Sequence, residues 1–345
     1  MKILFIETQL GGHHISYLDS LIANHDQTIV CLPQDDANIE AEKKYIVSIN
    51  RNCKLWYFSW IKEINRIIRK EQPDIVHFVY GDDLYRFWAI NFPKKVKIIF
   101  TCHQIRRSFL RDMAYKKISN SVNAMVVHTE KLKTDLEKIG IDNLYHIEYP
   151  QFSNTVVNLN ARKRLQIPDG IPVLLALGST RQDKGLDILL EALKTVHQPF
   201  FLLIAGAEST FDRDFIEEHV VTYKDYVKTL LKFLDDEEFS MCLSAADIIV
   251  LPYRKSFDGA SGPLGEGVNL GKMIVGANHG SLGRVIEENH LGYTFESENS
   301  EALASVLNMV LSSEWKPDSK YKKYQENLNP ERFQREYNEL YWSLL

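Results

Sequence analysis

Short apolar segments alternate with amphipathic ones along this chain, and this alternation constrains the fold more than any other feature. In the N-terminal half the apolar segments are rich in β-branched or aromatic side chains on both faces, which is typical of strands buried in a parallel sheet. The segments predicted as strands are KILFIE (2–7), QTIVCL (27–32), KLWYF (54–58), DIVHFVY (74–80), KIIFTC (97–102) and AMVVHT (124–129). Helical periodicity occupies residues 14–25 and 60–72, and Pro73 ends the second helix.

The same alternation begins again near residue 172. The segments predicted as strands here are 172–178, 199–206, 247–253, 272–277 and 292–295, and the predicted helices are 184–196, 236–246 and 300–313. Residues 149–170 lack a clear apolar period and contain two prolines, which predicts an interdomain linker. We therefore predict an α/β protein of two Rossmann-like αβα domains, residues 1–155 and 156–328, whose parallel sheets face an interdomain cleft.

The charge of the chain is uneven. A net charge of −5 argues against a nucleic-acid binder. Residues 1–155 carry 21 basic and 18 acidic side chains, whereas residues 156–345 carry 20 and 28. Residues 86–117 hold nine basic side chains and one acid. Such a run fits a solvated face, and it also fits a surface for anionic lipid or an anionic acceptor.

The cysteines and the lengths of the apolar runs indicate in which cellular compartment the protein is found. Cys31, Cys53, Cys102 and Cys242 are scattered without a CxxC pair, so neither a zinc knuckle nor a redox pair is indicated. Free thiols fit a reducing cytoplasm. The first residues lack the apolar core of a signal peptide, and no apolar run reaches 18 residues, so we expect a cytoplasmic protein that does not span a membrane.

Two loops that follow predicted strands of the first domain could contact a ligand. Gly11 and Gly12 precede a predicted helix, where glycine permits close backbone approach and the helix N-terminus offers free N–H groups to a phosphate. The loop lacks the GxGxxG spacing of a dinucleotide site, and a plain turn is the competing interpretation. His103 follows the strand 97–102, where it serves either a ligand or the structure.

The loop after the strand 172–178 places two cations beside a helix start. Arg181 and Lys184 stand in GSTRQDKG, and Lys184 is followed by Gly185 at the opening of the next predicted helix. Two cations at a helix N-terminus can hold a diphosphate without a metal. The alternative is a solvated loop.

The stretch SFDGASGPLGEG, residues 256–267, places two acids around a bare turn. The Ser-Gly-Pro at 261–263 predicts a helix start, with a capping residue and a proline in the first turn, so its free N–H groups would face an anion. Asp258 lies before this helix and Glu266 about one turn inside it. Because a carboxylate repels phosphate, we expect these acids to bind neutral hydroxyls, one on a ribose and the other on a sugar ring.

At these residues the chain resembles the retaining GT-B glycosyltransferases of family 4. The resemblance spans nearly the whole chain and rests on the glycine loop, the strand-end histidine, the G-x-x-R-x-x-K-G at 178–185 and the acid-x₇-acid element at 258–266. It implies a nucleotide-sugar donor held mostly by the C-terminal domain, no metal and no other cofactor, and retention of configuration. At position 258 the usual Glu is an Asp, one methylene shorter.

The resemblance also implies roles for single residues. It implies that Asp258 contacts the transferred sugar and Glu266 the ribose. It implies that Arg181 and Lys184 contact the diphosphate and that His103 lies near the sugar. The residues implied in catalysis are His103, Arg181, Lys184 and Asp258. Those implied in donor binding are Gly11, Gly12, Arg181, Lys184, Lys232, Phe233, Asp258, Ser261, Gly262, Pro263, Leu264 and Glu266.

The segment 329–345 has large apolar side chains on one helical face, which predicts packing. They are Phe333, Tyr337, Leu340, Tyr341 and Leu344. The resemblance implies that this helix crosses back onto the N-terminal domain.

The sequence thus predicts a metal-independent hexosyltransferase that moves a sugar, from a UDP-sugar rather than a GDP-sugar, onto a glycan or lipid-linked acceptor in polysaccharide biosynthesis. Peripheral contact with the inner face of an anionic membrane is part of this prediction. Two alternatives stay open: a GT-B epimerase acting on the nucleotide sugar, and a nucleotide-sugar binding protein without turnover.

Overall fold

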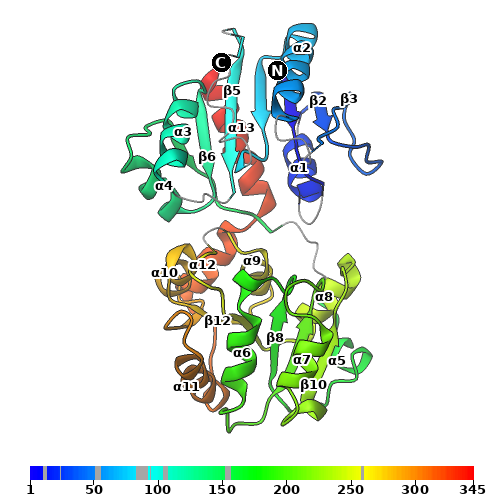
Figure 1. The fold of residues 1–345 in the computed structure, drawn as a ribbon, viewed down its shortest axis with the longest axis vertical. Helices are drawn as coiled ribbons and strands as arrows, with labels where there is room; N and C mark the ends of the chain where they lie inside the picture. The colour runs from blue at the N-terminus through cyan, green and yellow to red at the C-terminus, as the bar shows by residue number, and fades with distance from the viewer. Residues whose placement is uncertain are drawn as a thin grey trace. The chain divides into compact units, whose positions relative to one another are not determined.

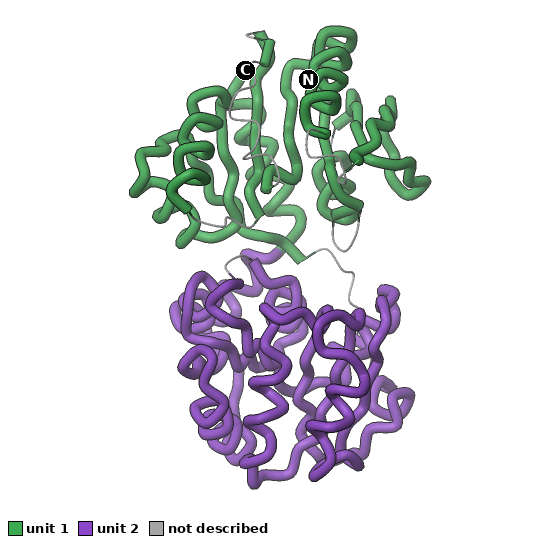
Figure 2. Tube along the Cα trace, in the orientation of Figure 1, with its two compact units in different colours: residues 1–152, 329–345 green, residues 153–328 purple. Residues whose placement is uncertain are grey.

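The chain forms two compact units, each built on one parallel sheet (Figures 1 and 2). The computed structural model describes residues 1–10, 14–23, 25–50, 56–82, 92–93, 95–103, 108–151, 157–257 and 260–345. One unit comprises Met1–Phe152 with Asn329–Leu345, and the other comprises Ser153–Leu328 (green and purple in Figure 2). The predicted fold class, two Rossmann-like α/β domains with parallel sheets, is confirmed.

The sheet of the first unit has the strand order β3-β2-β1-β4-β5-β6-β7. Its strands are β1 (Lys2–Ile6), β2 (Gln27–Leu32), β3 (Lys43–Ile46), β4 (Ile75–Phe78), β5 (Lys97–Cys102), β6 (Ala124–Val127) and β7 (Leu144–His146). Every side chain of β4 and β6 is buried, as expected of central strands covered on both faces. The strand order reverses between β1 and β4, and ligands bind at the carboxyl ends of strands beside such a switch point.

Helices cover both faces of this sheet. They are α1 (His14–Ile22), α2 (Trp56–Glu71), α3 (Phe109–Ser119), α4 (Glu130–Glu137) and α13 (Pro330–Leu344). Helices α2, α3 and α4 share one apolar core, which contains Trp60 and Tyr115. Helices α1 and α13 share the other, which contains Leu18 and Phe333. The last helix of the chain, red in Figure 1, therefore belongs to the N-terminal unit.

A line of buried hydrogen bonds joins α13 to the sheet. The hydroxyl of Tyr341 lies 2.8 Å from Nδ1 of His77, and Nε2 of His77 lies 2.8 Å from the hydroxyl of Thr101. The hydroxyl of Tyr337 lies 3.0 Å from that of Thr101 and 2.6 Å from that of Tyr17. Because a buried polar group is costly without a partner, these bonds fix the register of α13 on the sheet.

The strand expected at 54–58 is wrong. Residues 56–58 begin helix α2, because the large apolar side chains of Trp56, Trp60 and Ile64 recur every four residues and all three are buried on one helical face. The third strand is instead β3, at the edge of the sheet. Three of its four side chains are exposed, so it has no apolar run to reveal it.

Buried Glu71 fastens this edge strand. Its carboxylate accepts hydrogen bonds from the hydroxyl of Tyr45 (2.5 Å) and from the ammonium groups of Lys43 (2.9 Å) and Lys2 (3.1 Å). The bonds to Tyr45 and Lys43 lower the pKa of Glu71 to about 2. These hydrogen bonds connect β3 and β1 to the C-terminal end of α2.

The sheet of the second unit has the strand order β10-β9-β8-β11-β12-β13. Its strands are β8 (Val173–Leu177), β9 (Phe201–Ala205), β10 (Val227–Leu230), β11 (Ile248–Leu251), β12 (Met273–Ala277) and β13 (Gly292–Phe295). Its helices are α5 (Ala161–Arg164), η2 (Gln182–Lys184), α6 (Leu186–Leu193), α7 (Arg213–His219), η3 (Lys224–Tyr226), α8 (Asp236–Ala245), α9 (Gly262–Asn269), α10 (Gly280–Glu288), α11 (Ser300–Leu311) and α12 (Ser319–Asn327). The switch point of this sheet lies between β8 and β11.

The linker expected at 149–170 is too long. Helix α5 lies inside that stretch, and Ala161, Leu165 and Ile167 are part of the core of the second unit. The helix has only four residues, three of them basic, so it shows no apolar periodicity in the sequence.

Candidate active site

Two loops meet at the switch point of the second unit. The loop after β8 contains Gly178, with φ of +118°, and Gly185, with φ of +64°. A Cβ atom on Gly185 would collide with the carbonyl oxygen of Pro252, which follows β11, so only glycine allows this approach. A pocket of about 30 Å³ lies between the loops and is lined by backbone and side chains that include Ser179, Thr180, Lys184 and Tyr253.

Lys184 lies at the centre of this junction, on an aromatic platform. Its Nζ is 3.7 Å from the ring centroid of Tyr253 and 4.1 Å from that of Phe257. Burial, with a contribution from Arg181, lowers the pKa of Lys184 to about 7, although Asp183 acts in the opposite direction. Among the described residues no carboxylate lies within ion-pair distance of this ammonium.

Arg181 lies beside Lys184 and is bonded to Asp183. Its Nε and Nη2 atoms donate to the two carboxylate oxygens at 2.9 and 2.7 Å. Burial raises the pKa of Asp183, but the hydrogen bonds from Arg181 outweigh it and the net shift is downward. About half of the Arg181 side chain is exposed. Arg181 can contact a ligand only by giving up one of its two hydrogen bonds to Asp183.

The start of helix α9 forms the other wall of the junction. Ser261 caps the helix, and its hydroxyl lies 3.1 Å from that of Tyr253. Pro263 stands in the first turn, after Gly262. The side chain of Leu264 is buried in the apolar core, so at this position only the backbone faces the loop.

The acid pair is only partly described. Asp258 lies outside the described residues, as do Gly11 and Gly12 of the N-terminal loop. Glu266 lies in helix α9 and is 3% exposed, and a carboxylate is seldom buried to this degree unless it is paired. The structure therefore places Lys184, Arg181 and the capped start of α9 around one edge of the sheet, with Glu266 inside that helix.

Lys232 and Phe233 follow β10, two strands away from β8 at the same edge of the sheet. Lys232 forms an ion pair with Glu238 at 2.6 Å. Phe233 is 75% exposed, so its ring is available for stacking.

Sequence reasoning missed three residues of this edge. Tyr253 and Phe257 form the platform under Lys184, and they looked like ordinary apolar residues of a strand and its loop. Arg254 forms an ion pair with Asp187, and its Nε donates to the carbonyl of Gln182 at 3.0 Å, which links the two loops. The aromatic and basic residues at the end of the predicted strand 247–253 and just after it were the available signal.

In the first unit, His103 directly follows β5. Its backbone N–H donates to Asp82 at 2.8 Å, and its Nε2 lies 2.9 Å from the carbonyl oxygen of Val79. Burial, reinforced by His128, holds the pKa of His103 well below its ordinary value, so the ring is neutral. The rings of Tyr17 and His128 lie 4.9 and 4.8 Å from it.

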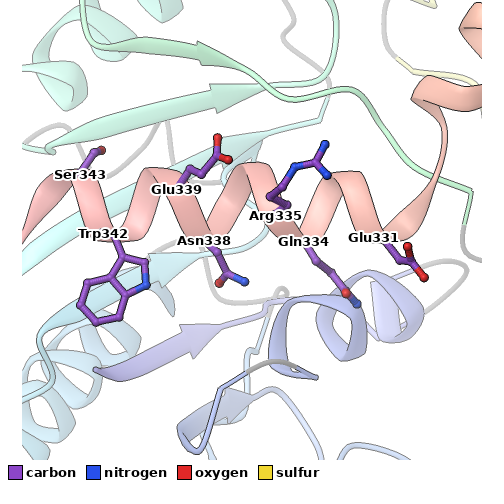
Figure 3. A pocket seen from close by; sticks show the side chains of 7 residues that line it. All are labelled: Glu331, Gln334, Arg335, Asn338, Glu339, Trp342 and Ser343. Atoms are coloured by element: carbon purple, nitrogen blue, oxygen red, sulfur yellow. The ribbon is translucent and has the colours of Figure 1, made fainter.

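An open hollow of about 780 Å³ runs along α13 (Figure 3). All the side chains that line it come from this one helix: Glu331, Gln334, Arg335, Asn338, Glu339, Trp342 and Ser343. None of these lining residues stands at the end of a strand, so the hollow is a helix surface and differs from the strand-end ligand sites of α/β sheets.

The described part of the chain contains no group of three or more His, Cys, Asp or Glu side chains that could hold a metal. None of its described helices is long and apolar enough to span a membrane.

Comparison with known proteins agrees with this organisation. Residues 15–148 match the family model described as Glycosyltransferase Family 4, and residues 158–328 match the model described as Glycosyl transferases group 1. A GDP-mannose:glycolipid 4-beta-D-mannosyltransferase of Xanthomonas campestris is 26% identical over 46% of this chain and 47% of its own length. The chain thus spans about half the length of the curated relatives it matches.

Solved structures share the fold over the whole chain. Sucrose-phosphate synthase from Thermosynechococcus elongatus has a TM-score of 0.79 at 18% identity, covering 100% of this chain and 99% of its own. HepE of Anabaena, solved with UDP and glucose, has a TM-score of 0.80 at 16% identity and covers 100% of both chains. The lipopolysaccharide outer core galactosyltransferase WaaB has a TM-score of 0.72 at 16% identity, again over 100% of both chains.

Proposed function

Because this chain consists of a Glycosyltransferase Family 4 domain followed by a group 1 glycosyl transferase domain in the GT-B fold, we propose that it transfers a hexose from a nucleoside-diphosphate sugar to an acceptor. The observation that carries the proposal is Lys184: an ammonium on two aromatic rings, at the switch point of the second sheet, with no carboxylate partner among the described residues. The leaving group of such a transfer is a diphosphate, and stabilising its growing charge is the largest task of the protein.

The residues at the carboxyl ends of β8 and β11 form the proposed binding site of the sugar donor. In the proposed complex Lys184 contacts the diphosphate, together with Arg181 once it exchanges part of its pair with Asp183. The N–H group of Gly262 at the start of α9 adds the positive end of a helix, whereas that of Leu264 is capped by Ser261. Glu266 holds the ribose, Asp258 the transferred sugar, and Lys232 and Phe233 flank the base.

We propose UDP as the nucleotide. HepE has been solved with UDP and with UDP-glucose, which supports this choice, whereas the curated relatives are named for GDP-mannose. Two cations and a helix start suffice to hold a diphosphate, so the proposed reaction needs no metal. We also propose retention of configuration, in which the donor phosphate accepts the proton of the attacking hydroxyl.

The proposed acceptor is lipid-linked, and the protein docks at the inner face of an anionic membrane. Helix α3 exposes Phe109, Leu110 and Met113, whose exposed fractions are 79%, 77% and 57%. Lys116 and Lys117 are exposed on the same helix. Apolar side chains beside basic ones suit a surface of anionic lipid. The curated relatives are named for a glycolipid acceptor, which supports this choice.

A donor panel tests the proposal. The melting temperature of the full chain is measured with UDP, GDP, ADP and several of their sugars, since a ligand at 100 times its Kd stabilises by about 2.7 kcal/mol. Stabilisation by one nucleotide is expected, followed by transfer of labelled sugar to membrane lipid extract. Conversion of the donor without acceptor would show an epimerase, and tight binding without any turnover would show a binding protein. No stabilisation by any nucleotide would refute the proposal.

A further inference from the structure

His279 lies in the second unit, between the end of β12 and the first residue of α10. It has no part in the proposed contacts with the donor. Its Nε2 lies 3.2 Å from the carbonyl oxygen of Phe257. Because a carbonyl oxygen only accepts hydrogen bonds, Nε2 carries a hydrogen and donates it. This bond joins the loop after β12 to the residue whose ring lies beside the ammonium of Lys184.

The side chain of His279 does not cap helix α10. A polar residue at the N-cap position usually accepts a hydrogen bond from a backbone N–H group of the first turn. His279 makes no such bond, and its Nδ1 is buried without a partner among the described residues. The N-cap residues of five other helices in this unit do accept one: Asp212, Asp235, Ser261, Asn299 and Asp318. Within the described chain, the bond to Phe257 is thus the one hydrogen bond of the His279 ring.

The turn that ends at Phe257 is attached to two neighbouring loops. The backbone N–H of Arg254 donates to the carbonyl of Asp183 at 2.9 Å, which fixes the beginning of the turn on the loop after β8. The backbone N–H of Phe257 donates to the carbonyl of Arg254 at 2.8 Å and closes the turn. The bond from His279 to the carbonyl of Phe257 fixes its other end on the loop after β12.

The position of the Phe257 ring affects the surroundings of Lys184. Nζ of Lys184 lies 4.1 Å from the centroid of this ring, and the ring packs edge-on against that of Tyr253 at 4.6 Å. Burial is the largest cause of the lowered pKa of Lys184, and both rings contribute to that burial. A turn without its bond to His279 would let the Phe257 ring move and water reach the ammonium.

We propose that His279 is a positioning residue of the donor site: by donating from Nε2 to the carbonyl oxygen of Phe257, it holds the Phe257 ring against Lys184. The inference rests on the proposed function, because Lys184 is the residue proposed to contact the diphosphate. It adds a residue from the loop after β12, which supplies none of the proposed donor contacts.

Two substitutions at position 279 separate this role from a purely structural one. In H279Q the amide nitrogen of the side chain occupies about the place of Nε2 and can still donate to Phe257. In H279N the side chain is one carbon shorter and its amide nitrogen reaches only about the place of Nδ1, so the bond is lost. Asparagine is a good N-cap residue, so H279N should melt at the wild-type temperature or above it.

The first measurement is the pKa of Lys184 in the full chain without ligand. Lysines labelled with ¹³C at Cε are titrated by NMR, and the signal of Lys184 is identified by its absence in K184R. In H279N the pKa of Lys184 should rise by about one unit or more toward its ordinary value, because water reaches the ammonium. In H279Q the pKa of Lys184 should stay at its wild-type value.

The second measurement is the transfer of labelled sugar from the donor. H279N should lower kcat about 10-fold, since a small displacement of a group that contacts the leaving diphosphate is costly, and H279Q should restore the rate. In an F257L background H279N should have little further effect, because both changes remove the same interaction.

His219 is the matched control. Its Nδ1 lies 2.8 Å from the carbonyl oxygen of Phe215, in a similar bond elsewhere in the second unit. H219Q should change neither the pKa of Lys184 nor kcat.

The inference is overturned if H279N leaves the pKa of Lys184 unchanged or lowers it, or if H279Q and H279N behave alike in both measurements. Its failure differs from failure of the proposed function, because the titration needs no ligand. An unchanged pKa in H279N with intact UDP binding refutes the role of His279 alone, whereas a chain that binds no nucleotide refutes the donor site.

Discussion

The ammonium of Lys184 lies 3.7 Å above the ring of Tyr253, at the point where strands β8 and β11 of the second sheet diverge. A cation on the face of an aromatic ring is stabilised without neutralisation. The platform therefore offsets part of the cost of burying the charged form of Lys184, and in the proposed complex a diphosphate adds to that stabilisation.

Substitution K184A should lower kcat on the order of 10²- to 10³-fold, because it removes a donor whose bond strengthens as the leaving group gains charge. Lys194 is the matched control, since it belongs to the same loop–helix segment and pairs with Glu191 on the surface. K194A should keep the wild-type rate. Initial rates with radiolabelled donor decide the matter, and near-normal kcat in K184A would remove this lysine from the mechanism.

Donor binding should take up a proton at pH 8. With a pKa of about 7, Lys184 is mostly neutral at pH 8 in the free protein, and a bound diphosphate raises that pKa. Uptake should approach one proton at pH 8 and vanish near pH 6, where the ammonium is already charged. Calorimetry of UDP-glucose binding in buffers of different ionisation enthalpy measures it. A K184A variant that takes up the same number of protons would contradict the assignment.

Asp258, in the loop before α9, and Glu266, within α9, should bind different parts of the donor. Substitution E266Q should weaken binding of free UDP about 10- to 100-fold, as expected for one charged hydrogen bond, while D258N should leave UDP binding unchanged and slow transfer. Calorimetry with UDP and with the intact donor separates the roles. Equal loss of UDP affinity in both variants would refute the division.

Helix α3 should dock on anionic lipid. The double substitution F109S/L110S should lower binding to vesicles of mixed neutral and anionic phospholipid at least tenfold, because it removes apolar surface that would leave water. A higher salt concentration should weaken vesicle binding by the wild-type protein, since charge interactions are screened beyond about 10 Å at 0.1 M. Leu159, 94% exposed in the other unit, is the control. Vesicle co-sedimentation that is equal for F109S/L110S and L159S would refute the docking surface.

Glu71 should make stability depend on pH in the acid range. Its pKa in the folded state is about 2, below the ordinary value of 4.5, so its contribution is complete above pH 4.5 and is lost as the pH falls toward 2. Substitution E71Q should reduce the free energy of unfolding by about 1–3 kcal/mol at pH 7 and by much less near pH 2.5. Urea unfolding at both pH values measures this. E63Q, which removes an exposed pair with Arg66, should change little at either pH.

Most of the fold could be predicted because its central strands are buried on both faces. Runs such as KIIFTC and DIIVLPY were predicted as strands for this reason. The edge strands β3, β7 and β10 were not predicted, because each has at most one buried side chain and no apolar run. The start of helix α2 was wrongly predicted as a strand, because its aromatic residues favour strands in isolation and are held in a helix by packing.

The candidate site could be predicted only in part, for a related reason. Arg181 and Lys184 were found because charged residues beside a glycine at a strand end are conspicuous. Tyr253 and Phe257 were missed, since an aromatic residue near a strand looks like core until the structure shows what lies above its ring.

The return of α13 to the first unit has a consequence for synthesis on the ribosome. The N-terminal unit emerges first, yet one face of its sheet is completed by Phe333, Tyr337, Leu340 and Tyr341. Until residues 330–344 have been made, that face stays open while the whole second unit is translated. The first unit therefore stays incompletely folded during this time. Its exposed apolar surface is of the kind that chaperones bind.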